Sequence, residues 1–172
     1  MLVSRIVAVA LLAGAFVPAF GIGPVSADSM FGSCSGGVIN WTADNGGISM
    51  SPKATTIAFA GEVSGCTGTP NGISGGSLSG TQNASGDCNT GVTGPVDLTV
   101  SWNNGTTSRL SGVWTAHAAI PDTNVVNIVG GEGAGQQIEI NTTNNPTPTD
   151  AAACWGDGLT SGSHSITAAY FR

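Results

Sequence analysis

GPVDLTVSWNNGTTSRLSGVWTA, residues 94–116, predicts two β-strands joined by a tight turn. Its first half alternates apolar and polar residues, which is the period of a half-buried strand. The NNG triplet that follows favours left-handed backbone conformations. A three-residue loop with Gly105 left-handed pairs Leu98 with Leu110 and places Trp114 on the face of Leu98, whereas a two-residue loop inverts that face. We therefore predict a hairpin with the three-residue loop, whose buried face organises the rest of the chain.

The remaining chain adds further short extended segments, giving about eight strands in all, and no segment has helical periodicity. Residues 72–81 are rich in Gly and Ser and predict an edge strand, residues 83–93 a loop, and residues 144–150 a stiff proline-rich loop. Residues 162–171 carry apolar groups on both faces, which is typical of a central strand. We predict an all-β fold, an antiparallel two-sheet Ig-like sandwich, with a closed β-barrel as the alternative.

The first 27 residues have the three parts of a secretory signal peptide. Arg5 precedes an apolar run over residues 6–20, and the small-x-small triplet VSA ends at Ala27. A transmembrane anchor is the alternative, but the run is short and contains Gly and Pro, so it does not suit a bilayer span. We expect cleavage after Ala27 and a single exported domain over residues 28–172.

Composition narrows the classes of partner. The 172 residues include four basic and ten acidic side chains, a net charge of −6 that becomes −7 when Arg5 leaves with the signal peptide. Charged residues are only 8% of the chain, so Ser, Thr and Asn must cover the surface, as in exported all-β proteins. An acidic surface repels phosphate backbones and anionic lipid, which argues against nucleic acid and against membrane insertion after signal removal. We expect an extracellular or cell-envelope partner.

The cysteines predict a disulfide framework. An even number of cysteines in an exported domain is typical of disulfide pairing, and the wide spacings without a CxxC pair disfavour zinc. Pairing of Cys66 with Cys88 is the least favoured of the three connectivities, because an antiparallel hairpin turning near Pro70 carries the two apart. The sequence does not choose between the other two. The four cysteines are Cys34, Cys66, Cys88 and Cys154.

No motif points to catalysis, a cofactor or a metal. The GISGG stretch around Ser74 matches a nucleophile-elbow pattern, but no helix is predicted after it, as that mechanism requires. His117 and His164 lack an evident carboxylate or histidine partner, so we interpret them as surface or rim residues. Four acids lie near glycine or asparagine without the spacing of a calcium loop. These acids are Asp44, Asp122, Glu132 and Asp157.

The tryptophans are the best candidates for ligand contact, since an indole ring stacks well on planar or sugar groups. Trp102 and Trp114 belong to the buried face of the central hairpin and are expected in the core. Trp155 follows Cys154 in a Gly-containing segment and is the strongest exposed candidate. Trp41 is the second candidate, and the sequence does not decide between core and surface for it.

Several stretches are similar to small secreted actinobacterial proteins: a leading CSGG, then TTIAFAGEVSGC, GISGGSLSG, SWNNGTTS and a late lone cysteine. Those proteins are β-sandwiches of uncharacterised function, and the similarity covers nearly all of residues 28–172. The resemblance implies export and an Ig-like fold, and it brings no catalytic residue to assign here.

Three functions remain as hypotheses. We predict a non-enzymatic exported module that acts by binding or as an envelope component, because no polar cluster has catalytic spacing. The first alternative is a carrier for a small ligand, with a cleft lined by side chains such as Ile138, Ile140 or Tyr170. The second alternative is a secreted hydrolase using Ser74 or a histidine.

Overall fold

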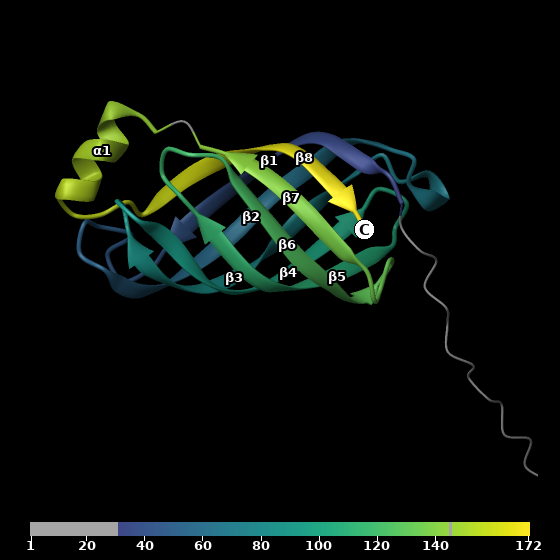
Figure 1. Cartoon of the computed structure of the whole chain (residues 1–172), viewed down its shortest axis with the longest axis horizontal. Coiled ribbons are helices and arrows are strands. Elements are labelled where there is room, and N and C mark those ends of the chain that lie inside the picture. Colours follow the sequence, from purple (N-terminus) through teal and green to yellow (C-terminus); the bar gives the residue numbers. More distant parts are fainter. Residues whose placement is uncertain (1–30, 145) are drawn as a thin grey trace, which may run out of the picture.

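The computed structural model describes residues 31–144 and 146–172, so the predicted signal peptide, residues 1–27, lies outside it. Eight strands follow one another as an antiparallel meander, and the last returns to pair with the first (Figure 1). Their bounds are β1 (Ser33–Ala43), β2 (Lys53–Thr67), β3 (Gly75–Asp87), β4 (Gly91–Trp102), β5 (Thr107–Ala116), β6 (Asp122–Gly131), β7 (Gln137–Thr143) and β8 (Ser161–Phe171), with a 3₁₀ turn η1 (Pro70–Gly72) and a helix α1 (Pro148–Trp155).

The sheet closes into one barrel, which shows that the predicted two-sheet sandwich is wrong and that its alternative, the closed β-barrel, is correct. β1 pairs with β2 along one edge and with β8 along the other, for example through Ile39↔Gly61 and Ile39↔His164. Alternation of apolar and polar residues is the same in a sandwich and in a barrel, because both bury one face of every strand. Only the pairing of the first strand with the last separates the two folds.

The central hairpin has the predicted register. Leu98 pairs with Leu110, and the N–H of Trp102 donates to the carbonyl of Thr106 at 2.9 Å. Gly105 is left-handed, with φ of 86°. Leu98, Leu110 and Trp114 are all buried on the inner face, so the three-residue loop is confirmed.

Three local predictions are wrong. Residues 72–81 do not form an edge, because β3 pairs with both β2 and β4, and most of the predicted loop over residues 83–93 belongs to β3 and β4. Gly, Ser and Asn have low strand propensity, so these segments look weaker in sequence than they are in a closed sheet, where neighbours on both sides supply the hydrogen bonds. Residues 148–155 form α1 although no helix was predicted.

The sequence at the start of α1 contains a helix-capping motif, which the prediction of a proline-rich loop did not take into account. The Thr147 hydroxyl accepts from the N–H of Asp150, and the Asp150 carboxylate accepts from the N–H of Thr147, which together form a capping box. Pro148 occupies the first helical turn, where its missing N–H costs no hydrogen bond. The helix has only 8 residues, too few for its apolar periodicity to stand out.

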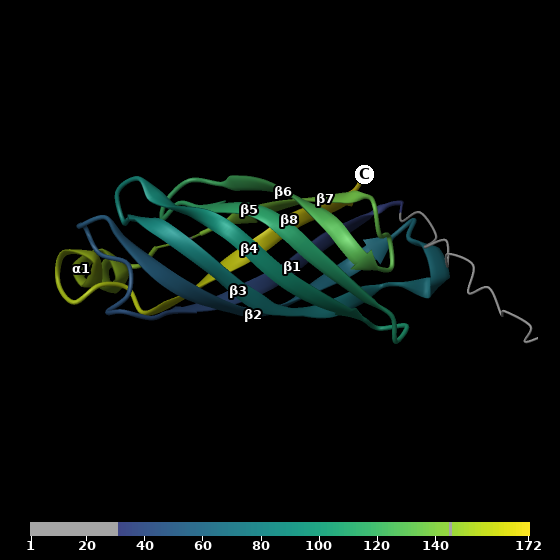
Figure 2. The same cartoon turned by 90° about the horizontal axis from the view of Figure 1, so that it is seen from below.

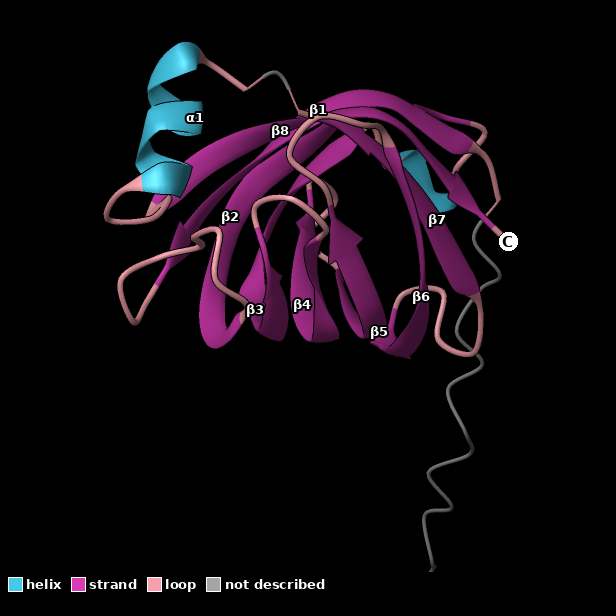
Figure 3. Cartoon of the chain, turned by 60° about the vertical axis from the view of Figure 1, so that its left-hand side comes forward, coloured by secondary structure: helices cyan, strands magenta, loops and turns pink. Residues whose placement is uncertain are grey.

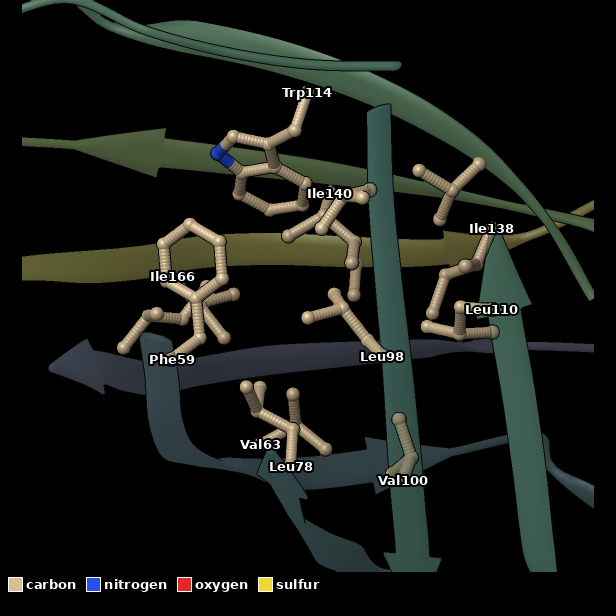
Figure 4. Packing of buried hydrophobic residues seen from close by; sticks show 14 of the residues in the cluster. Phe59, Val63, Leu78, Leu98, Val100, Leu110, Trp114, Ile138, Ile140 and Ile166 are labelled. Carbon is tan, nitrogen blue, oxygen red and sulfur yellow. The ribbon is translucent and has the colours of Figure 1, made fainter. Parts of the chain in front are cut away.

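The barrel interior is packed with aliphatic and aromatic side chains from all eight strands. Figure 4 shows Phe59, Leu98, Trp114, Ile140 and Ile166 pointing into one shared space. Strands cross the long axis obliquely (Figure 2), the tilt that closure of a sheet requires. Eight strands leave an interior that side chains fill or that holds one small ligand.

The two ends of the barrel differ. At the end where β8 finishes, Trp102 and Phe171 meet edge to face with ring centroids 5.8 Å apart. Nε1 of Trp102 donates to the Ser108 hydroxyl at 2.8 Å, which donates in turn to the carbonyl of Glu132 at 2.7 Å. This chain of hydrogen bonds connects β4, β5 and the β6–β7 turn at that end. The opposite end, beside α1 in Figure 1, is called the α1 end below.

Two disulfides confirm the predicted framework and resolve its connectivity. Cys34–Cys66 joins directly paired residues of β1 and β2, and Cys88–Cys154 ties the β3–β4 turn to α1. As expected from the antiparallel path of β2 and β3, Cys66 and Cys88 are not joined. Disulfides of this kind persist in oxidising compartments, which indicates an extracellular type of environment.

Within residues 31–144 and 146–172, no helix is both long enough and apolar enough to cross a membrane.

Candidate functional site

The candidate site is a pocket inside the barrel at the α1 end, called the barrel pocket. Figure 3 turns this end forward, and α1 lies to one side of the strand ends. The volume of the pocket that the centre of a water molecule can occupy is about 50 Å³. Adding the radius of a water molecule gives room of roughly 200 Å³, the size of a small ring compound rather than of a drug-sized ligand. Its apolar lining consists mainly of Ile39, Ile57, Phe59, Val92, Trp114 and Leu159.

Three aromatic side chains, Trp41, Phe59 and Trp114, form part of the apolar side. The rings of Phe59 and Trp114 lie with centroids 6.1 Å apart and planes inclined by 48°. The indole of Trp41 lies on the backbone of Gly162, so close that a Cβ at position 162 would be 2.5 Å from its Cζ2. Gly162 therefore leaves the space that the Trp41 ring occupies at the pocket wall.

A histidine backed by a buried carboxylate forms part of the polar side. Nδ1 of His117 lies 2.5 Å from Oδ1 of Asp122, whose Oδ2 accepts from the backbone N–H of His117 at 2.8 Å. The two residues stand at the ends of the β5–β6 connection. Backbone pairing of these strands extends only to Gly112↔Val126, and nearer the α1 end the Asn124 side chain bridges them through both backbone groups of Thr115. At the α1 end, side-chain hydrogen bonds therefore take the place of backbone hydrogen bonds between β5 and β6.

His164 lies on the inner face of β8 and is 7% exposed. Its ring meets the Trp41 indole edge to face, with centroids 6.5 Å apart. Burial lowers the pKa of His164 below its ordinary value of 6.5, and the nearby Asp122 carboxylate opposes this only in part. The imidazole is therefore neutral over a wider pH range, and no hydrogen bond to it is formed among the described residues.

Three buried polar atoms in or near the pocket wall have no hydrogen-bond partner within the described part of the chain: Nε1 of Trp41, Oε1 of Gln82 and Oγ1 of Thr142. Gln82 is fully buried, and its Nε2 donates to the carbonyl of Trp114 at 2.6 Å. Trp41 and Gln82 line the pocket, and Thr142 pairs with Asp122 in the strand register. An unpaired buried polar atom costs about 1–3 kcal/mol, so such atoms at a pocket indicate a missing partner.

A second depression, called the outer groove, continues from the pocket towards α1. The volume of this groove that the centre of a water molecule can occupy is about 500 Å³. Its lining includes Trp41, Ala118 and Leu159, which also line the barrel pocket. Trp155 lines it and is 79% exposed. The Cys88–Cys154 disulfide holds α1 at this groove, so the helix borders the way into the pocket.

The two tryptophans predicted as ligand contacts both lie at this site, Trp41 in the pocket wall and Trp155 in the outer groove. The residues proposed for a cleft do not line the barrel pocket: Ile138 and Ile140 are buried deeper in the core, and Tyr170 faces outward. The apolar residues on both nominal faces of residues 162–171 are explained by a register shift in the pairing of β8 with β7. Because of this shift, Ile166, Ala169 and Phe171 are all buried although they do not follow one strict alternation.

The sequence predicts that both histidines are surface or rim residues without partners. This prediction is wrong about the exposure of His164 and about the lack of a partner for His117. His164 is buried, and His117 is paired with Asp122. His117 lies five residues before Asp122, and only the turn between β5 and β6 brings the two side chains together. Gln82 was missed altogether, since the sequence around it has no recognisable pattern.

The remaining candidates do not gather at the site. Ser74 lies before β3 at the end away from α1, where its N–H donates to Oδ1 of Asn103. Asp44 accepts from the N–H of Thr56 and from the Thr55 hydroxyl, which lowers the pKa of its carboxyl. Within residues 31–144 and 146–172, no three His, Cys, Asp or Glu side chains are placed to hold a metal ion.

His164 predicts a pH dependence of stability. Because its folded pKa is lowered, the unfolded chain binds more protons below pH 6.5, and the free energy of unfolding falls as pH decreases through that window. One proton gives a slope of at most about 1.4 kcal/mol per pH unit. Urea unfolding at a series of pH values should show a shallower slope for His164→Gln than for the parent protein. An equal slope in both would contradict a neutral buried His164.

Comparison with known protein families finds no matching family, and comparison with curated proteins finds no matching relative. The similarity to small secreted actinobacterial proteins therefore stays a prediction, and the barrel pocket is the observation on which a function can be argued.

Proposed function

We propose that this protein is a non-enzymatic exported carrier that binds a small, largely apolar ring compound in the barrel pocket. One observation carries the proposal: a mostly apolar pocket contains buried hydrogen-bonding atoms, on Trp41 and Gln82, that no described residue satisfies. Ligand sites are typically apolar cavities with a few placed polar groups. The two disulfides suit an exported protein.

The test uses 4-nitroanisole, a flat apolar nitroaromatic that quenches indole fluorescence when it binds nearby. Trp41 and Trp114 line the pocket, so saturable quenching is expected at micromolar to millimolar concentrations. Trp155→Phe removes the exposed indole and should leave the saturable component intact. Quenching that rises linearly without saturation would overturn the proposal.

A matched pair of variants locates the binding. Ala118 lines both the barrel pocket and the outer groove, whereas Ala119 lines the groove alone. Ala118→Phe fills the pocket mouth and is expected to weaken 4-nitroanisole binding about tenfold or more, because the ring takes the space of the ligand. Ala119→Phe should bind as the parent does. Equal binding by both variants would place the ligand elsewhere.

A further inference from the structure

Among the residues that line the barrel pocket, one unpaired buried atom is a hydrogen-bond acceptor, Oε1 of Gln82, and one is a donor, Nε1 of Trp41. Oε1 of Gln82 can only accept. Asp87, at the end of β3, also lines the pocket, and its carboxylate accepts from the N–H groups of Asn89 and Thr90 at 2.8 and 2.7 Å. Trp41 is the one lining residue whose unpaired buried atom is a donor. A ligand that pairs with these atoms must therefore donate a hydrogen bond as well as accept one.

His117 adds a further acceptor. An ionised carboxylate accepts hydrogen bonds only, so Nδ1 of His117 donates to Oδ1 of Asp122, and the neutral ring keeps a lone pair on Nε2. The backbone N–H of His117 also donates to Asp122, which holds the ring and the carboxylate in fixed relation. No described residue makes a hydrogen bond to Nε2, and the ring lines the pocket.

We infer, on the basis of the proposed carrier function, that the ligand is an aromatic compound with a weakly acidic hydroxyl group, which donates its proton to Nε2 of His117 while its ring lies against Phe59 and Trp114. The hydroxyl and the imidazole share one proton. With the proton on the ligand the pair is a neutral hydroxyl and a neutral imidazole, and with the proton on His117 it is a phenolate and an imidazolium, so the two forms have the same composition. An acidic hydroxyl therefore suits His117 in either protonation state.

The charges at the pocket favour this class over a permanent anion or a simple hydrogen-bond donor. Asp87 lines the pocket and Asp122 lies behind His117, in contact with its Nδ1, so both carboxylates repel an anion that brings no proton. A ligand that shares one proton with His117 adds no net charge to the site. A weakly donating N–H gains less, because hydrogen bonds that carry charge are about twice as strong as neutral ones.

The experiment compares three probes of nearly equal shape: 4-nitrophenol, 4-nitroaniline and 4-nitroanisole. Binding is followed by quenching of tryptophan fluorescence, and the visible absorption band of 4-nitrophenol reports its ionisation. We expect 4-nitrophenol to bind about tenfold more tightly than 4-nitroanisole, with 4-nitroaniline between them or equal to the anisole. The bound 4-nitrophenol band should move towards that of the phenolate.

Two variants assign the preference to the pair. His117→Gln should reduce the preference for 4-nitrophenol over 4-nitroanisole to about one, and saturable quenching by 4-nitroanisole, whatever its affinity, shows that the variant still has the pocket. Asp122→Asn should reduce the same preference, because the ring then loses the partner that keeps its proton on Nδ1. His117→Gln that retains the full preference would overturn the inference.

The outcomes separate this inference from the carrier proposal. If all three probes bind equally, or if 4-nitroaniline binds as tightly as 4-nitrophenol, the acidic-hydroxyl class is wrong and the carrier function stands. If none of the probes binds saturably, both are wrong.

Discussion

Replacing both Cys88 and Cys154 by serine is expected to lower the free energy of unfolding by about 4 kcal/mol. The disulfide joins residues 66 positions apart, and a cross-link of that span removes a large part of the conformational freedom of the unfolded chain. Chemical denaturation of the two proteins under identical buffer conditions measures the difference. A loss below about 1 kcal/mol would mean that the unfolded chain is already restricted near these residues.

The matched control is serine replacement of Cys34 and Cys66. Their span is 32 positions, about half as long, and each doubling of loop length changes closure entropy by about 0.6 kcal/mol. The control should therefore lose nearly as much stability. Only loss of Cys88–Cys154 frees α1 from the outer groove, so only that variant should release 4-nitroanisole faster in stopped-flow fluorescence. Equal release rates would show that α1 does not border the entry path.

Gly80→Ala is expected to destabilise the barrel by about 3 kcal/mol or more. Gly80 pairs with Leu98, and a Cβ at this position would lie 2.1 Å from the carbonyl oxygen of Asp97 and 2.8 Å from Cα of Leu98. Both atoms belong to the backbone of β4, which cannot move aside without breaking its hydrogen bonds to β3. Overpacking against backbone exceeds the usual 1–3 kcal/mol for extra core methyl groups.

Ser79→Ala is the control for this substitution. Ser79 is the neighbour of Gly80 on the exposed face of β3, where a change of this size usually stays within about 0.5 kcal/mol. Guanidinium unfolding followed by circular dichroism compares the two. If Gly80→Ala falls within 1 kcal/mol of Ser79→Ala, the close approach of β3 and β4 does not constrain the barrel.

The prediction also bears on why the barrel closes. Gly61 and Gly94 are in the same situation as Gly80, since a Cβ at either position would lie 2.0 Å from a carbonyl oxygen of the adjacent strand. Glycines at these points let neighbouring strands approach closely while the sheet curves. In the sequence, Gly80 belongs to a Gly- and Ser-rich segment with few large apolar residues, which is the reason for the mistaken edge strand over residues 72–81.

The candidate site was accessible from the sequence only in part. Trp41 and Trp155 were identified because indoles are few and chemically distinctive. The pairing of His117 with Asp122 depends on the β5–β6 turn, and the burial of His164 depends on which face of β8 points inward. Gln82 has no sequence signal at all, because an inward-facing glutamine is recognised only when its neighbours are known.

What the sequence determined alone is local. Alternation over residues 94–116, the NNG turn and the even cysteine count led to extended strands, a hairpin register and disulfide bonding, because each depends on residues that are adjacent in the chain or on simple chemistry. What the tertiary structure decided is the closure of β8 onto β1 and the pocket it encloses. Strand alternation is the same in a sandwich and a barrel, and the pairing of the chain's first and last strands is a long-range contact that no local pattern contains.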